Sequence, residues 1–205
     1  MKNKPVIAII GGGFCGSALL IQLARQSQNP LEIILINKEN PLSKGIAYSS
    51  YNPKHILNVP AAKMSAFPDD PDNFINWIKS KPEFSEYVNE DLNDRFMPRV
   101  IYGKYLKELF EETVNNLPPN IFLKIIEDEV TDVIPSESVT DIILKKGDPV
   151  KADKVVLALG NFGPEDPRIQ NNDFFKSKNY FSNPWKQEAV SGLNDDDNVL
   201  IIGTG

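Results

Sequence analysis

Hydrophobic residues along the chain fall into short continuous runs and helical repeats that alternate from the N-terminus. Residues 5–10 (PVIAII) form an uninterrupted apolar run, which is typical of a strand buried on both faces of a parallel sheet. Apolar residues at helical spacing predict a helix over residues 17–28, and residues 31–36 (LEIILI) predict a second buried strand. This strand–helix–strand order predicts a βαβ unit with a right-handed crossover.

Residues 37–70 show no regular period and contain several prolines. A loop of this length is usually functional or disordered. Because it carries many apolar and aromatic side chains, we expect it to pack against the core or a ligand. Asp70 and Pro71 at its end predict the N-cap and first residue of a further helix.

The second half of the chain is predicted to begin with a long amphipathic helix over residues 99–117, which Pro118 and Pro119 end. Strands are predicted over residues 121–126, 130–134, 139–144 and 150–159. Residues 161–197 are rich in proline and asparagine and are interpreted as a linker, with Phe162, Tyr180 and Trp185 as anchors. These elements predict an α/β fold of three layers, with a mostly parallel central sheet and an antiparallel β insertion.

Two of the predicted strands run directly into glycines. After the first strand, Gly11, Gly13 and Gly16 fit a phosphate-binding turn: the first makes the tight turn, the second lets a pyrophosphate approach, and the third allows close helix–strand packing. The helix that follows would place its partly positive N-terminus at the phosphates. The expected nucleotide-binding residues therefore include Phe14 and Cys15, which lie within this turn.

The second strand–glycine signal is residues 198–202 followed by Gly203 and Gly205, where the sequence ends. We expect an incomplete fingerprint at the start of a second nucleotide-binding domain, and hence a fragment of a longer protein. The other interpretation is a glycine-rich strand end without a ligand. Two signals in one chain suggest two nucleotides, as in an enzyme that holds FAD and NAD(P)H together.

An acidic residue about 20 positions after the glycines normally binds a ribose hydroxyl. At that place, the end of the second predicted strand, the chain has Asn37. An asparagine can both donate to and accept from a ribose diol, and it does not repel a 2′-phosphate as a carboxylate would. Glu39 is the alternative if the strand ends later.

Single cysteine and histidine residues limit the other chemistry of the chain. Cys15 is predicted at a helix start, where thiolates are stabilised, which would allow a nucleophilic or redox role, but the favoured interpretation is a small residue facing the cofactor or core. The chain has no second cysteine, so a disulfide-reductase mechanism lacks support. His55 is interpreted as a structural or ligand-contacting residue, with an acid–base role as the alternative. One histidine and one cysteine make no soft-ligand metal cluster, so no metal site is expected.

Charge and composition exclude several classes of partner. The net charge of −6 gives no electrostatic support for binding nucleic acid or an anionic membrane. No apolar run approaches the ~18 residues of a membrane span, and glycines interrupt the apolar stretch after the basic N-terminus, unlike a signal peptide. We expect a cytoplasmic protein that acts on a small molecule. Neither the substrate nor the oligomeric state follows from the sequence.

Several blocks beyond the glycines carry a resemblance. They are residues 11–16, GIAYS at 45–49, HILNVPA at 55–61, MSAFP at 64–68, PR at 98–99 with YG at 102–103, LALGN at 157–161, NPW at 183–185 and IIGTG at 201–205. The chain resembles bacterial FAD/NAD(P)-binding proteins with two dinucleotide-binding domains, in particular a subgroup that includes FAD-dependent hydroxylases.

This resemblance implies a Rossmann-like FAD-binding domain over residues 1–160, a linker over 161–197, and an incomplete NAD(P)H-binding domain over 198–205. It implies an FAD-dependent oxidoreductase reduced by NAD(P)H, with a monooxygenase-like cycle. The cofactor contacts it implies are Leu57, Asn58, Met64 and Ser65 for the flavin, Val130 for the adenine, Gly160 near FAD, and Gly203 and Gly205 for NAD(P)H. It assigns no catalytic residue.

Two other functions remain open at this point. A single-nucleotide NAD(P)-dependent dehydrogenase would bind no flavin and would need a substrate domain. A non-enzymatic dinucleotide-binding module would bind tightly without turnover and act on a partner. The absorption spectrum of the purified protein separates these from a flavoprotein.

Overall fold

The structure is a computed structural model that describes residues 4–39, 41–184 and 186–202. The chain divides into two compact units, Met1–Gly160 and Asn161–Gly205. Each unit is described by itself. The expected boundaries of the FAD-binding domain and the linker stay a prediction.

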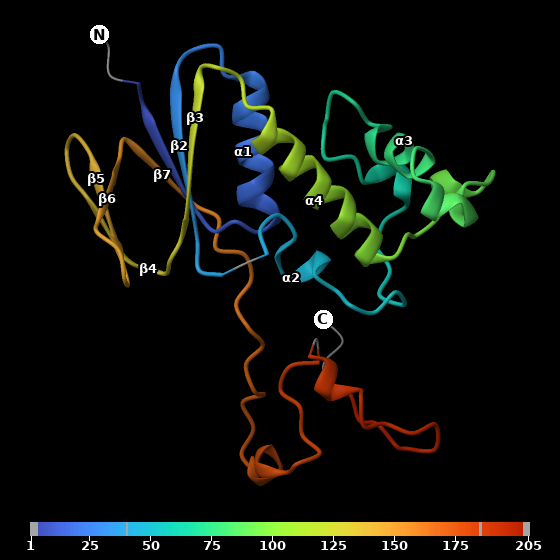
Figure 1. Ribbon diagram of the computed structural model, residues 1–205. Helices are drawn as coiled ribbons and strands as arrows, with labels where there is room; N and C mark the ends of the chain where they lie inside the picture. The colour runs from blue at the N-terminus through green and yellow to red at the C-terminus, as the bar shows by residue number, and fades with distance from the viewer. Residues whose placement is uncertain (1–3, 40, 185, 203–205) are drawn as a thin grey trace. The chain divides into compact units, whose positions relative to one another are not determined.

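A parallel sheet of four strands is the centre of the first unit (Figure 1). Its strands are β1 (Val6–Ile10), β2 (Leu31–Asn37), β3 (Ile121–Glu127) and β7 (Lys154–Leu157), in the order β3-β2-β1-β7. The predicted helix between the first two strands is α1 (Phe14–Gln26). It begins three residues earlier than expected, directly after Gly13, so the helix N-terminus lies at the turn itself and Gly16 lies within the first turn of the helix.

Apolar side chains on the two faces of this sheet form two separate cores. On one face, Ile9, Ile33 and Leu35 pack with Leu20 of α1 and Phe110 of α4 (Arg99–Asn115). On the other face, side chains of β1 and β2 pack against an antiparallel sheet of β4 (Val130–Pro135), β5 (Thr140–Leu144) and β6 (Val150–Ala152). Figure 1 shows these three layers, with α1 and α4 on one side and β4–β6 on the other. The expected α/β fold with three layers and an antiparallel insertion is confirmed.

The segment between β2 and α4 forms a small helical lobe. It holds α2 (Gly45–Tyr48) and α3 (Asn73–Lys79), and the 3₁₀ turns η1 (Ala61–Lys63), η2 (Pro82–Tyr87) and η3 (Leu92–Asp94). Its core includes Phe74, Met97, Tyr102 and Tyr105, all fully buried. The expectation that the aperiodic region packs against a core is confirmed, because Leu57 and Ala61 belong to this cluster.

The predicted helix start at Asp70 and Pro71 is wrong. The amide of Asp70 donates to the Phe67 carbonyl in a turn, and α3 begins at Asn73 after the N-cap Asp72. The Asp70 side chain accepts from Asn73 Nδ2 at 2.8 Å instead of capping the helix that was expected. Asp70 instead opens a turn over residues 70–73, in which the Asn73 amide donates to the Asp70 carbonyl at 3.1 Å, so the helix starts later than the local signal indicates.

The single predicted strand over residues 150–159 is also wrong, because it divides at Asp153 into β6 and β7. The first part pairs antiparallel with β5, and the second pairs parallel with β1. Asp153 marks the crossing: its amide donates to the Val6 carbonyl at 2.9 Å, and its Oδ2 accepts from the Val6 amide at 2.6 Å. One run of sequence therefore contributes to both sheets.

Among its described residues, the second unit has little regular structure apart from the 3₁₀ turns η4 (Asp173–Lys176) and η5 (Gln187–Ala189). Phe174, Phe175 and Tyr180 form a small aromatic cluster in it. Of the expected anchors, Phe162 is exposed, and Trp185 lies outside the described residues. The expected strand at residues 198–202 is not formed. Its apolar side chains are exposed, and a strand needs a hydrogen-bonding neighbour to persist.

Candidate nucleotide-binding site

The glycine turn joins β1 to α1 at the edge of the sheet where the parallel strands end. Gly11 has a φ of +106°, and its amide donates to the Ile36 carbonyl at 2.8 Å. A Cβ on Gly11 would collide with the carbonyl oxygen of Ala158, and one on Gly16 would collide with the carbonyl of Gly11. Only glycine therefore fits either position. The turn lies at the carboxyl ends of the strands, where ligands bind in open α/β sheets.

The peptide group between Gly12 and Gly13 is fixed by hydrogen bonds to its carbonyl oxygen. The Gly12 carbonyl accepts from Ser17 Oγ at 3.0 Å and from the amide of Ser43 at 2.7 Å. A trans peptide directs its C=O and N–H to opposite sides. The N–H of Gly13 is therefore directed away from Ser17 and Ser43.

The N-terminus of α1 offers further backbone donors at the same place. Gly13 is the N-cap residue, and no side chain caps the helix within the described part of the chain. The amides of Phe14 and Cys15, in the first turn, have no carbonyl partner within the helix, and this end carries the positive part of the helix dipole. These amides and that of Gly13 form an arrangement that suits a phosphate or pyrophosphate.

A glycine from the segment after β2, Gly45, lies close to this turn. Gly45 has a φ of +60°, and a Cβ there would lie 3.3 Å from the Phe14 amide nitrogen and 3.6 Å from Gly13 Cα. Neither Gly45 nor Ser17 and Ser43 was expected as a site residue. The signal for Gly45 was present, since it opens the GIAYS block, but the close approach to Gly13 depends on the fold.

Ser43 is an unusual residue within the same loop. It has a φ of +79°, its side chain is 2% exposed, and its Oγ has no hydrogen-bond partner among the described residues. It lines a small internal cavity together with Phe14, Ser17 and Gln22. A hydroxyl buried without a partner costs free energy, so this loop is held in place by its other contacts with the turn.

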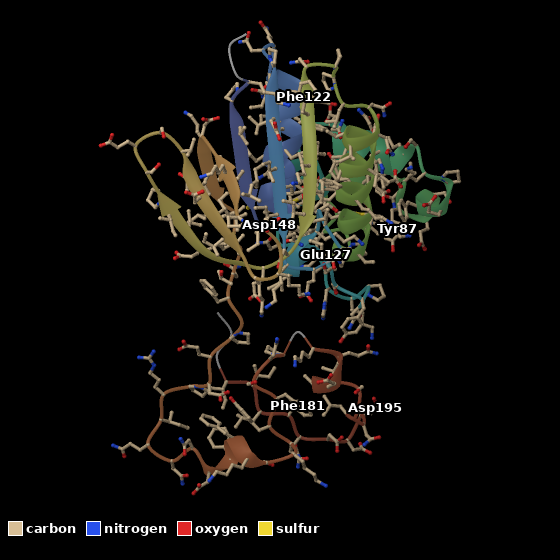
Figure 2. All side chains as sticks on the ribbon, turned by 60° about the vertical axis from the view of Figure 1, so that its left-hand side comes forward. Tyr87, Phe122, Glu127, Asp148, Phe181 and Asp195 are labelled. Atoms are coloured by element: carbon tan, nitrogen blue, oxygen red, sulfur yellow. The ribbon has the colours of Figure 1, made fainter. Side chains whose placement is uncertain are left out.

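Asn37 ends β2 and faces the glycine turn. Its Oδ1 accepts from the Gly12 amide at 2.7 Å, and its Nδ2 donates to the carbonyl of Glu39. Its own carbonyl accepts from the amide of Asp128 at 3.0 Å. Figure 2 labels Glu127, the register partner of Asn37 in β3, and so marks this edge of the sheet. The side chain expected at a ribose thus makes hydrogen bonds within the protein.

Charged residues surround the expected adenine contact. Glu129 pairs with Lys145 at 2.7 Å and with Lys38 at 3.0 Å, and these hydrogen bonds lower the pKa of its carboxyl. Burial raises the pKa of Asp128, but hydrogen bonds from the amides of Gly147, Glu129 and Lys146 outweigh it, so the net shift is downward. Val130 follows in β4 and is half-buried. The turn at Asp128 and Glu129, between β3 and β4, therefore places the start of β4 close to the end of β2.

The residues expected at the flavin lie in different environments. Leu57 and Met64 are buried in the core of the helical lobe, and Asn58 is exposed. Ser65 Oγ accepts from the Phe67 amide at 3.0 Å and lies 2.6 Å from the Asp70 carbonyl oxygen. The flavin contacts of all four stay a prediction.

The remaining expected contacts lie at the end of the first unit and beyond. Gly160, at the end of that unit, has a φ of +71° and open space around it. Gly203 and Gly205 lie outside the described residues. The role of Gly160 stays a prediction.

His55 and Arg99 tie the loop to the start of α4. Ser50 Oγ lies 2.6 Å from His55 Nδ1, and the amide of Arg99 donates to the His55 carbonyl at 2.7 Å. Arg99 Nε also donates to the carbonyl of Ile56 at 2.9 Å. Cys15 is exposed and is not part of a disulfide. These contacts show a structural role for Arg99, and they assign no acid–base role to His55.

Among the residues that the structure describes, no helix is long and apolar enough to cross a membrane. Within the same residues, no group of three or more histidine, cysteine or acidic side chains is placed to hold a metal ion.

A family model described as FAD-NAD(P)-binding matches residues 8–162 of the chain. No curated protein matches the sequence. Among solved structures, a closed cyclohexanone monooxygenase is 15% identical, with a TM-score of 0.51 over 82% of this chain and 28% of its own. A mutant cyclohexanone monooxygenase from Rhodococcus sp. Phi1, bound to NADP+, is 18% identical, with a TM-score of 0.51 over 82% of this chain and 29% of its own.

The bacillithiol disulfide reductase Bdr of Staphylococcus aureus is 20% identical, with a TM-score of 0.49 over 77% of this chain and 38% of its own. The chain thus spans between about a quarter and two fifths of the length of these structures. At such identities the two monooxygenase structures show a shared fold.

Proposed function

Because the chain belongs to the FAD-NAD(P)-binding family, we propose that it acts in an FAD-dependent oxidoreductase reduced by NAD(P)H. The adenosine diphosphate part of FAD would lie against the turn from Gly11 to Gly16. The observation that carries this proposal is the glycine N-cap of α1, whose backbone donors lie at the carboxyl edge of the parallel sheet.

The residues of the turn fit a pyrophosphate. Gly11 and Gly16 have no room for a Cβ, which keeps the backbone close to the helix N-terminus. The Gly12 amide is used by Asn37, so the donors left for the phosphates are those of Gly13, Phe14 and Cys15. A doubly charged pyrophosphate would be stabilised by these dipoles although the chain as a whole is acidic.

When bound, FAD supplies the redox chemistry, because it accepts a hydride from NAD(P)H and passes electrons onward. The part of the protein is to bind and orient the cofactor. The amides of residues 13–15 would hold the pyrophosphate, and the backbone of Val130 would meet the adenine. Leu57 and Met64, buried in the helical lobe, would shape the apolar side of the flavin site and exclude water there.

The reaction proposed for the whole protein is the oxidation of a small molecule, with hydroxylation by oxygen as the finer proposal. Two cyclohexanone monooxygenases share the fold, one of them bound to NADP+. The resemblance of the sequence blocks to FAD-dependent hydroxylases supports the same class. The alternatives of a dehydrogenase without flavin or a binding module predict a colourless protein or one without turnover.

The test is the absorption spectrum of the purified protein, with chromatography of any cofactor released on denaturation, and titration of the colourless form with FAD. We expect a flavin spectrum and release of FAD. Folded protein that takes up neither FAD nor NAD(P)H would contradict the proposal. NADPH and NADH oxidation in air and in its absence would then test the use of oxygen.

Gly13→Ala tests by mutation whether FAD binds at this turn. Its Cβ would lie 3.3 Å from Gly45 Cα, on the side where the two glycines approach, and we expect FAD affinity to fall by about tenfold or more, the equivalent of one or two lost hydrogen bonds. Gly163→Ala is the control, because no atom of the described residues lies within 4 Å of its added Cβ. Equal FAD affinity of the two variants would place the pyrophosphate elsewhere.

A further inference from the structure

Asn37 stands where a carboxylate normally binds the ribose, yet both polar atoms of its side chain contact the protein's own backbone. Oδ1 accepts from the Gly12 amide at 2.7 Å, and Nδ2 donates to the Glu39 carbonyl. An amide side chain can make this pair of contacts because it carries one acceptor and one donor group. A carboxylate could accept from Gly12 but would face the Glu39 carbonyl with a second acceptor.

The hydrogen bond from the Gly12 amide to Asn37 matters because the carbonyl of Gly12 is fixed as well. The Gly12 carbonyl is held by Ser17 Oγ and the Ser43 amide. Gly12 is therefore bound through its N–H by Asn37 and through its C=O by two further groups, and it is buried. With both peptide groups of Gly12 fixed, the direction of the following N–H, that of Gly13, is fixed as well.

The packing around Gly12 supports the same interpretation. A Cβ on Gly12 would lie 3.2 Å from Cβ and Cγ of Asn37 and would collide with Leu42 Cδ2. The Asn37 side chain thus lies flat against the turn instead of extending past it. Its backbone is fixed too, because its carbonyl accepts from the Asp128 amide.

We propose that Asn37 is a positioning residue for the nucleotide phosphates, which acts through Gly12, and that it is not the ligand of the adenosine ribose. This inference rests on the proposed function, since it assumes that a nucleotide diphosphate binds at the turn. It accounts for the absence of an acidic residue at this position: the turn here is held by an amide.

The experiment compares two probes on two proteins. ADP and 2′,3′-dideoxy-ADP are titrated calorimetrically against the full chain and against Asn37→Ala. We expect Asn37→Ala to weaken ADP binding by about tenfold, as for one lost hydrogen bond that orders the site. The ratio of the two affinities, which reports the ribose hydroxyls, is expected to be the same in both proteins, because independent contacts add.

A ribose ligand gives the opposite pattern. If Asn37 bound the diol, removal of the hydroxyls would weaken binding to the wild type but not to Asn37→Ala, and the inference would be overturned. Asn116→Ala is the control, since Asn116 also donates from Nδ2 to a backbone carbonyl, that of Glu112, and is exposed at the end of α4. It is expected to bind ADP like the wild type.

Asn37→Asp keeps the test decisive if Asn37→Ala does not fold. It retains the acceptor for the Gly12 amide, so we expect a smaller loss of ADP affinity and an unchanged ratio between the probes. A larger ratio would show that this position reaches the ribose and would overturn the inference. Failure of the wild type to bind either ADP or FAD would instead contradict the proposed function itself, which separates the two outcomes.

Discussion

Two polar side chains near the site differ in how the protein satisfies them. The Asp128 carboxylate is buried and accepts from the amides of Glu129, Lys146 and Gly147. The hydroxyl of Ser43 is buried and has no hydrogen-bond partner in the described part of the chain, and its backbone is in the left-handed region. The first side chain therefore strengthens its turn, whereas the second adds a cost to its loop.

Ser43→Gly is expected to raise the free energy of unfolding by about 0.5–1 kcal/mol, because glycine adopts a positive φ without strain and the unpaired hydroxyl is removed. Ser43→Ala removes the hydroxyl but keeps the strain, so it is expected to change stability less. Urea denaturation of both variants gives the comparison. A clear loss of stability in Ser43→Ala would show that the hydroxyl has a partner.

Asp128 gives a prediction on pH. Its pKa is lowered from an ordinary value of 3.8 in the folded protein, so its contribution to stability is present above that value. The contribution is lost as the pH falls through the lower folded pKa. We expect the unfolding free energy of the wild type to fall more steeply below about pH 4 than that of Asp128→Asn, which is already less stable at pH 7. Parallel pH profiles would contradict this.

At the scale of elements, the strands and helices of the βαβ unit could be predicted because their patterns are local. Buried parallel strands are continuous apolar runs, and β2 and β3 were predicted to within one residue. The errors lie where tertiary contacts decide. The run of residues 150–159 looks like one strand, but its two parts, separated at Asp153, pair with different sheets. Residues 198–202 form no strand.

Tyr105 connects two helices and a loop of the helical lobe. Its hydroxyl donates to Asn73 Oδ1 at 2.7 Å and accepts from the Ala66 amide at 3.2 Å, and its ring is fully buried. Tyr105→Phe removes both hydrogen bonds, each of which contributes about 0.5–1.5 kcal/mol, so we expect a loss of about 1–3 kcal/mol of stability by urea denaturation. Tyr51→Phe, at an exposed tyrosine, should leave stability nearly unchanged.

At the scale of the molecule, the glycine turn could be located from sequence because its spacing and its flanking strand and helix are local signals. The partners of that turn could not be located in this way. Gly45, Ser43 and Ala158 reach it from other segments, and only the fold brings them together. The inward direction of the Asn37 side chain likewise follows from its position beside Gly12.

Ligand binding at the turn gives a prediction for the whole first unit. A nucleotide that binds only the folded state adds about 2.7 kcal/mol of stability at a concentration 100-fold above its Kd. We expect FAD to raise the melting temperature of the wild type, and to raise it much less for Gly13→Ala at the same concentration. An equal shift for both proteins would indicate binding away from the glycines.

The pairing of Val6 with Asp153 joins positions that are 147 residues apart, and this separation has a consequence for synthesis. As the chain leaves the ribosome, β1 can pair early with β2, but its other edge has no neighbour until residues 154–157 emerge. Such high contact order slows folding. Until those residues emerge, the nascent protein therefore exposes an open strand edge, which is the kind of surface on which aggregation begins and which chaperones shield.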